Sequence, residues 1–121
     1  MKKKGLSSVG EFGFIERIRK NAPVSASVKL GIGDDAAVLT GTKQLQLFTT
    51  DMLVEDSHFR LKEATGFEIG RKALAVNISD IAAMGGLPTH AVAAVGFPAK
   101  LPLSLPSGLK IHTLALVGSQ T

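Results

Sequence analysis

The sequence of 121 residues contains no cysteine, no tryptophan and no tyrosine. Without cysteine the chain has no disulfide, no thiolate metal site and no cysteine nucleophile. Any metal ion must therefore be held by oxygen atoms or by one of the 3 histidines. Apolar residues make up 45% of the chain and charged residues 20%, which is typical of one compact, ordered domain.

Long hydrophobic runs are also missing. No stretch approaches the roughly 18 consecutive apolar residues of a membrane span. The lysines at positions 2–4 resemble the start of a secretory signal, but no apolar run of signal-peptide length follows them. We therefore expect a cytoplasmic protein without a membrane partner.

The net charge of +4 does not indicate nucleic-acid binding. Residues 1–20 carry six basic and two acidic side chains, whereas residues 21–60 carry three basic and five acidic ones. A duplex-binding surface needs basic side chains clustered on one face, often with aromatic residues between them. The acidic middle of this chain offers neither, so we expect no nucleic-acid partner.

Two amphipathic helices are predicted, over residues 11–20 and 67–84. Thr65 and Glu68 have the spacing of a capping box at the start of the second helix, and Gly85 follows its end. Both helices have apolar residues at helical spacing.

Strands are predicted at residues 36–39, 44–50 and 89–97, and the glycine-rich residues 28–35 are predicted to form a loop. The first two strands are expected to pair as a hairpin with Asp51 at its far end. These elements together predict an α+β fold, with a mixed or antiparallel sheet and flanking helices. After Pro98 the pattern weakens, because prolines and a glycine interrupt the leucine-rich stretches.

Familiar catalytic motifs are absent. The sequence has no P-loop, no complete glycine fingerprint for dinucleotides, no G-x-S-x-G and no H-E-x-x-H. These absences argue against a P-loop NTPase, a Rossmann enzyme and the common hydrolases and zinc proteases.

Carboxylates stand at several unusual positions instead. Asp34 and Asp35 follow a Gly-Ile-Gly loop, which either uses them for its turn or presents an oxygen ligand. Asp51 follows two threonines at a predicted strand end, where a simple turn is the alternative. Asp80 falls on the predicted apolar face of its helix, between Val76 and Met84. A carboxylate there needs either a cation or local partners, and three neighbours could serve: Lys72, Asn77 and Ser79.

Oxygen ligands of this kind favour Mg²⁺ over zinc or copper, and magnesium held by scattered carboxylates commonly binds phosphates. His58 lies in an acidic loop seven residues beyond Asp51. Taken alone, this position predicts a surface histidine.

Three segments carry a family resemblance. They are Gly31-Ile-Gly-Asp-Asp-Ala36, Thr49-Thr-Asp51 with His58-Phe59, and the stretch from Arg71 to Gly85. In this order and spacing they resemble the N-terminal signature of the thiamine-monophosphate kinase family, within the aminoimidazole-ribonucleotide-synthetase superfamily. The resemblance covers residues 10–98.

The resemblance implies an ATP- and Mg²⁺-dependent transfer of a phosphoryl group to thiamine monophosphate, giving thiamine diphosphate. It also implies a homodimer of two-domain subunits, paired through their N-terminal sheets. His58 then contacts the substrate. No catalytic base is expected, because the attacking phosphate oxygen is already deprotonated. The residues implied as metal ligands are Asp35, Thr49, Thr50, Asp51 and Asp80.

The resemblance also suggests an organisation: residues 1–9 as a basic tail, 10–98 as the N-terminal metal- and ATP-binding domain, and 99–121 as its degraded or truncated end, without a C-terminal domain. Gln120 stands where the family has a metal-binding aspartate. We therefore expect little or no activity from this chain alone. The alternatives are a non-catalytic dimerisation module and a sibling small-phosphate kinase or synthetase of the same superfamily.

Overall fold

A computed structural model describes residues 8–96 and 113–120 of the chain. These residues belong to two compact units, one made of residues 8–43 and the other of residues 44–96 and 113–120. No helix within these described ranges is long and apolar enough to cross a membrane.

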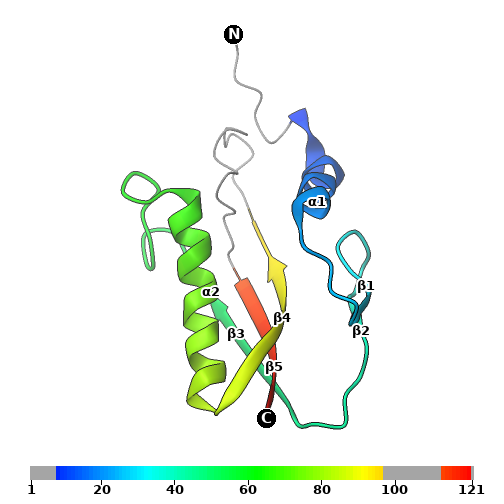
Figure 1. Cartoon of the computed structure of the whole chain (residues 1–121). Coiled ribbons are helices and arrows are strands. Elements are labelled where there is room, and N and C mark those ends of the chain that lie inside the picture. Colours follow the sequence, from blue (N-terminus) through cyan, green and yellow to red (C-terminus); the bar gives the residue numbers. More distant parts are fainter. Residues whose placement is uncertain (1–7, 97–112, 121) are drawn as a thin grey trace. The chain divides into compact units, whose positions relative to one another are not determined.

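The first unit contains one helix and a short two-stranded sheet (Figure 1). Helix α1 (Gly10–Asn21) confirms the first predicted helix and buries Phe14. Strand β1 (Val28–Leu30) pairs antiparallel with β2 (Val38–Leu39). The prediction that residues 28–35 are all loop was therefore wrong at their start, where the alternation of Val28 and Leu30 is too short to be recognised as a strand pattern.

The second unit is a three-stranded sheet with a long helix against it (Figure 1). Its elements are β3 (Gln46–Met52), α2 (Gly66–Ala83), β4 (Gly86–Ala94) and β5 (Thr113–Gln120). The strand order is β3-β5-β4, and both pairings are antiparallel. Helices and antiparallel sheets together confirm the predicted α+β fold.

The predicted hairpin does not form. Strand β2 pairs with β1, and β3 pairs along its whole length with β5, from Gln46 opposite Ser119 to Met52 opposite Thr113. The segment 113–120, which the sequence pattern left without an element, is thus the central strand of the sheet. A strand finds its partner through packing that brings distant segments together, which local alternation does not encode.

Helix α2 buries a stripe of residues at four-residue intervals: Ile69, Ala73, Asn77 and Ile81. The prediction that Val76, Asp80 and Met84 continue this buried face was wrong, because Asp80 and Met84 are exposed. Successive steps of four residues advance by about 40° beyond a full turn, so the stripe winds around the helix. A winding stripe fits a helix that crosses a twisted sheet.

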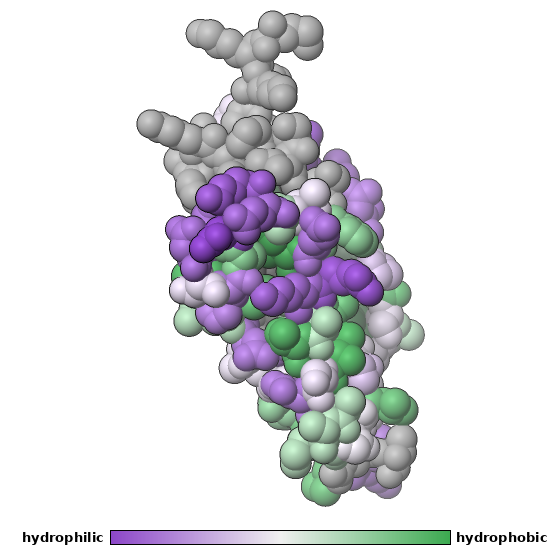
Figure 2. Space-filling view, turned by 90° about the vertical axis from the view of Figure 1, so that its left-hand side faces the viewer, coloured by the Kyte–Doolittle hydropathy of each residue, from purple (hydrophilic) through white to green (hydrophobic). Residues whose placement is uncertain are grey.

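The outer surface of this unit changes character along α2. Figure 2 shows hydrophilic side chains gathered over the upper part of this face, where the loop before α2 lies, and mostly hydrophobic ones toward its lower end. The exposed apolar residues of α2 include Leu74 and Ile78, with Met84 just after the helix.

The predicted capping box is present at the start of α2. The Thr65 side chain accepts a hydrogen bond from the Glu68 N–H at 3.3 Å, and the Glu68 carboxylate accepts one from the Thr65 N–H at 2.7 Å. These bonds from Thr65, first the backbone one, lower the pKa of Glu68. The contribution of Glu68 to stability is therefore complete above its ordinary pKa and is lost as the pH falls through the lowered one.

Replacing Thr65 with alanine is expected to lower the free energy of unfolding by about 1 kcal/mol, because a helix N–H then loses its acceptor. Urea denaturation followed by circular dichroism measures the change. Ser79→Ala, at an exposed position of the same helix, is the control and should change stability by less than about 0.5 kcal/mol. Equal losses in the two variants would contradict the capping role.

Candidate functional site

The strand-end motif and the helix motif meet in the second unit. The side chains of β3 alternate along the strand, with Thr49 and Asp51 half-buried and Thr50 exposed. Thr49 Oγ1 donates a hydrogen bond of 2.9 Å to Asp80 Oδ2 on α2, across 31 positions of sequence. Two of the five predicted metal ligands are therefore in direct contact, and Asp51 shares the face of Thr49.

Thr50 does not share this arrangement, because adjacent residues of a strand point to opposite faces. Its side chain lies on the face away from Thr49 and Asp51. The three consecutive residues that the sequence grouped as ligands are thus divided by the strand geometry.

Asp80 is exposed, and this changes the argument for its role. A carboxylate in contact with water keeps most of its hydration, so its desolvation cost is much smaller than that of a buried carboxylate. Asp80 therefore needs no cation for stability. Among the described residues, its hydrogen-bond partner is the neutral Thr49 hydroxyl, which donates to it. The Asp80 carboxylate thus remains open on its other sides to a ligand from solution.

A complete metal site is not formed by these side chains alone. Within residues 8–96 and 113–120, no group of three or more His, Cys, Asp or Glu side chains lies close enough to hold an ion. The donors that do meet here, a carboxylate and a hydroxyl, are hard oxygen ligands of the kind that Mg²⁺ prefers. The donor atoms are of the type that suits magnesium, but they are too few to complete its coordination, so a bound ion would need further ligands.

The glycine loop of the first unit separates the roles of its two aspartates. Gly33 has a φ of +115°, which a residue with a side chain rarely adopts. Asp34 Oδ1 accepts a hydrogen bond of 2.9 Å from the backbone N–H of Asp35. Asp34 therefore serves the turn, while the carboxylate of Asp35 is exposed and forms no hydrogen bond with the described residues. Asp35, the member of the pair predicted as a ligand, is the one left open to bind.

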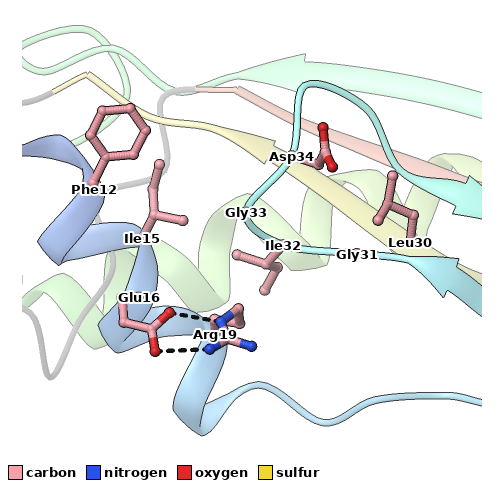
Figure 3. Close-up of a pocket in the computed structure, with 9 residues that line it drawn as sticks. All are labelled: Phe12, Ile15, Glu16, Arg19, Leu30, Gly31, Ile32, Gly33 and Asp34. Atoms are coloured by element: carbon pink, nitrogen blue, oxygen red, sulfur yellow. Dashed lines mark hydrogen bonds and ion pairs between the residues drawn. The ribbon is translucent and has the colours of Figure 1, made fainter.

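An open cavity of about 530 Å³ lies beside this loop, within the first unit (Figure 3). Helix α1, the end of β1 and the loop after β1 form its walls. Its lining is apolar except for three charged side chains, one of which is Asp34. The lining residues are Phe12, Ile15, Glu16, Arg19, Leu30, Gly31, Ile32, Gly33 and Asp34.

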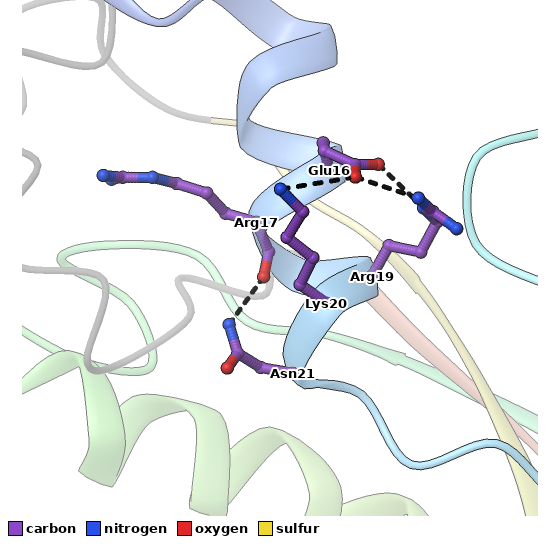
Figure 4. A network of polar contacts seen from close by, with 5 residues as sticks. All are labelled: Glu16, Arg17, Arg19, Lys20 and Asn21. Carbon is purple, nitrogen blue, oxygen red and sulfur yellow. Dashed lines mark hydrogen bonds and ion pairs between the residues drawn. The ribbon is translucent and has the colours of Figure 1, made fainter.

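The other two charged side chains of this cavity pair with each other (Figure 4). Arg19 donates two hydrogen bonds to Glu16, at 2.7 and 2.9 Å, and Lys20 lies 3.7 Å from the same carboxylate. The hydrogen bonds from Arg19 lower the pKa of Glu16, and the same contact raises the pKa of Arg19. These groups are exposed, so the pair contributes little stability, and it holds the Arg19 guanidinium at the rim of the cavity.

His58 lies in a tightly bonded loop between β3 and α2. Its ring atom Nδ1 accepts a hydrogen bond of 3.0 Å from the backbone N–H of Val54. The backbone N–H of His58 in turn donates to the Val54 carbonyl at 2.8 Å. The ammonium of Lys72 on α2 donates to the His58 carbonyl at 2.5 Å. The sequence predicted an acidic loop around His58, and the structure shows that hydrogen bonds hold both the ring and the backbone of His58 within that loop.

Sequence reasoning did not identify Lys72 in this position. It was considered only as a partner for Asp80, eight residues away. The bond to His58 spans 14 residues, and no spacing rule for helices or strands relates two such positions. The sequence linked Lys72 and His58 only indirectly, because each of them lies in one of the segments that carry the family resemblance.

Comparison with known proteins places the chain in a family. Residues 33–114 match the family model described as AIR synthase related protein, N-terminal domain. The chain belongs to this family.

Several similar proteins share one name. Thiamine-monophosphate kinase of Mycobacterium tuberculosis (strain CDC 1551 / Oshkosh) is 44% identical over 104 residues, which are 86% of this chain and 31% of that protein. Thiamine-monophosphate kinase of Bacillus subtilis (strain 168) is 46% identical over 91 residues, 74% of this chain and 28% of that protein. These matches confirm the resemblance found in the sequence motifs, and this chain spans about a third of the relatives' length.

A solved structure is similar as well. The crystal structure of thiamine-monophosphate kinase from Stenotrophomonas maltophilia K279a superposes with a TM-score of 0.69 at 29% identity. The match covers 91% of this chain and 42% of that one. The chain therefore has the fold of the N-terminal region of these kinases.

Proposed function

We propose that this chain supplies the N-terminal, metal- and ATP-binding part of an enzyme that transfers the γ-phosphoryl group of ATP to thiamine monophosphate, giving thiamine diphosphate. The observation that carries the proposal is the hydrogen bond from Thr49 to Asp80, because it joins two of the family's motifs at one place. The family match and the shared name of the relatives support the same activity.

Magnesium is the proposed metal. Asp80, Asp51 and Thr49 would hold it in the second unit. Asp35, in the glycine loop of the first unit, is also proposed as a metal ligand. When bound, Mg²⁺ supplies positive charge that neutralises the phosphate oxygens of two anionic reactants. The chain itself needs no general base, since a phosphate oxygen is already a nucleophile.

The remaining roles follow from the same proposal. His58 is the substrate-contacting residue, and it offers its second ring nitrogen to thiamine monophosphate. The enzyme is proposed to work in the cytoplasm as a homodimer. Residues 10–98 form the proposed functional domain, with 1–9 as a basic tail. Residues 1–7 and 97–112 lie outside the described residues, whereas 113–120 form β5.

The experiment uses ligand-dependent stability. Mg-ATP is expected to raise the melting temperature of the 121-residue chain, because a ligand that binds only the folded state stabilises it. In Asp80→Asn this increase should disappear, since an amide oxygen without negative charge is a much weaker magnesium ligand. Scanning fluorimetry at increasing Mg-ATP, with ATP plus EDTA as a blank, measures both.

The control variant is Glu63→Gln, which makes the same chemical change at an exposed carboxylate paired with Arg60. It should retain the full increase. An Asp80→Asn chain stabilised as much as the wild type would overturn the assignment of the metal site. We also expect little thiamine diphosphate formation from this chain alone, given Gln120 in place of an aspartate, and turnover at a normal enzymatic rate would contradict that expectation.

A second candidate function is a non-catalytic dimerisation module. It is favoured by exposed apolar side chains on the strands: Phe48 is 75% exposed, Met52 59% and Val92 51%. Under this reading the chain self-associates tightly but is not stabilised by Mg-ATP. Sedimentation velocity with and without Mg-ATP, read beside the melting curves, separates the two candidates.

A further inference from the structure

We infer that Lys72 is a positioning residue for His58: it fixes the loop of residues 53–59 on helix α2, so that the imidazole presents its Nε2–H as a ready hydrogen-bond donor. The inference rests on the proposed substrate role of His58 and adds the residue that orients it. The ligand group that this donor suits is an acceptor oxygen of a small phosphate ester.

The first step is the tautomer of the ring. Nδ1 of His58 accepts the hydrogen bond from the Val54 N–H at 3.0 Å, so it carries no proton. In a neutral imidazole the proton is then on Nε2. Because Nδ1 is occupied by the backbone, Nε2–H is the polar group of the ring that is left for a ligand.

The second step is the stiffness of the loop. The His58 N–H donates to the Val54 carbonyl at 2.8 Å, and the Asp56 N–H donates to the Phe59 carbonyl at 2.8 Å. Asp56 has a φ of +66°, a left-handed conformation that these bonds hold in place. Phe59 packs against the core cluster that contains Leu53. Residues on both sides of His58 are thus anchored.

The third step is the link to the helix. The Lys72 ammonium donates to the His58 carbonyl at 2.5 Å, and within the described residues no other hydrogen bond joins α2 to residues 53–60. Lys72 precedes the buried Ala73, which holds this part of α2 against the sheet. A charged donor on a fixed helix therefore sets the position of the His58 backbone, and the backbone sets the ring.

If Lys72 only positions His58, its loss changes the orientation of the imidazole and not the stability of the fold. Removing the ammonium leaves the core contacts of Ala73 and Phe59 intact, so the fold persists. The carbonyl of His58 loses its charged donor, and the loop gains freedom to break the bond between Val54 and the ring. The two ring tautomers then mix, and the direction of Nε2–H is no longer defined.

The test uses nuclear magnetic resonance of the 121-residue chain without any ligand. Long-range ¹H–¹⁵N spectra of the His58 ring should show a proton on Nε2 and an unprotonated, hydrogen-bonded Nδ1 in the wild type. Lys72→Met is expected to shift the ring nitrogens toward a mixture of tautomers. It should also raise the hydrogen exchange of the Val54 and His58 amides by about tenfold or more, the factor expected for losing one charge-assisted hydrogen bond.

Two further variants complete the test. Lys72→Arg keeps a charged donor and should restore the wild-type ring signals. Lys62→Met removes an exposed lysine of the same loop region and should change neither readout. Wild-type ring signals and amide exchange in Lys72→Met, with its fold intact by circular dichroism, would overturn the inference.

The substrate role is tested separately. Thiamine monophosphate should shift the Nε2–H signal of the wild type, with thiamine lacking the phosphate as the comparison. An unmoved His58 signal would count against the proposed function of this histidine. It would not affect the ligand-free result, so the two failures are distinguishable.

Discussion

Asn77→Asp is expected to destabilise the protein by about 3 kcal/mol or more near neutral pH, the size of effect seen when a charge is left buried without a partner. Asn77 is 0% exposed, in the stripe of α2 that packs on the sheet. Its Nδ2 donates to the Ala73 carbonyl at 2.9 Å, while its Oδ1 has no partner among the described residues. An aspartate there would turn an oxygen toward the Ala73 carbonyl and would find no donor for its charge.

The loss should depend on pH in a defined direction. Burial raises the pKa of a carboxyl group above its unfolded value. The aspartate variant therefore loses stability as the pH rises above the unfolded pKa of about 3.9, and the difference from the wild type shrinks toward lower pH. Chemical denaturation at several pH values measures this trend.

Ser79→Asp is the matched control, because it adds the same charge two residues away at an exposed position. It should cost less than about 1 kcal/mol, mainly through its place near the negative end of the helix dipole. If both variants lose the same stability at every pH, burial of residue 77 is not the cause.

Gly118→Ala is expected to have the next largest effect, a loss of about 1–3 kcal/mol from overpacking. Gly118 lies in β5, and a Cβ built on it would be 2.7 Å from Ile81 Cγ2 and 3.1 Å from the Leu87 carbonyl oxygen. Ile81 is 1% exposed, so it has no free space to move into. The strand or the helix must then shift, and thermal or urea unfolding should show the loss.

Gly41→Ala is the control, since nothing lies within 4 Å of a Cβ at that position. It should leave stability nearly unchanged. The double variant Gly118→Ala with Ile81→Ala gives a second check, because the added methyl group then occupies the space left by the isoleucine. Its loss should be smaller than the sum of the single losses, and strict additivity would argue against the contact.

The elements with strong local signals were predictable. Helix α2 was found from its apolar spacing, and its start was fixed by the hydrogen-bonding pattern available to Thr65 and Glu68. Gly85, with a φ of +69°, follows its end as expected for a residue without a Cβ. These features depend on contacts within a few residues, so the chain encodes them locally.

The face of α2 was not predictable. From Ile69 and Ala73 the pattern continues equally well through Val76 and Asp80 or through Asn77 and Ile81, since helical neighbours occur at both three and four residues. The stripe through Asn77 is the buried one because the sheet beneath the helix determines which step is followed. Because the buried stripe runs through Asn77 instead of Val76, the Asp80 carboxylate, which was predicted to be buried, is exposed.

By itself, the sequence determined which chemistry is possible: with no cysteine, binding groups are limited to oxygen atoms and histidines, and the ordered motifs identify the family. The tertiary structure decided which of these groups meet. It paired Thr49 with Asp80, turned Thr50 to the other face and bound Lys72 to the His58 backbone. The physical reason is that residue type is set by the covalent chain, whereas proximity over 14 or 31 positions depends on how a helix packs on a sheet.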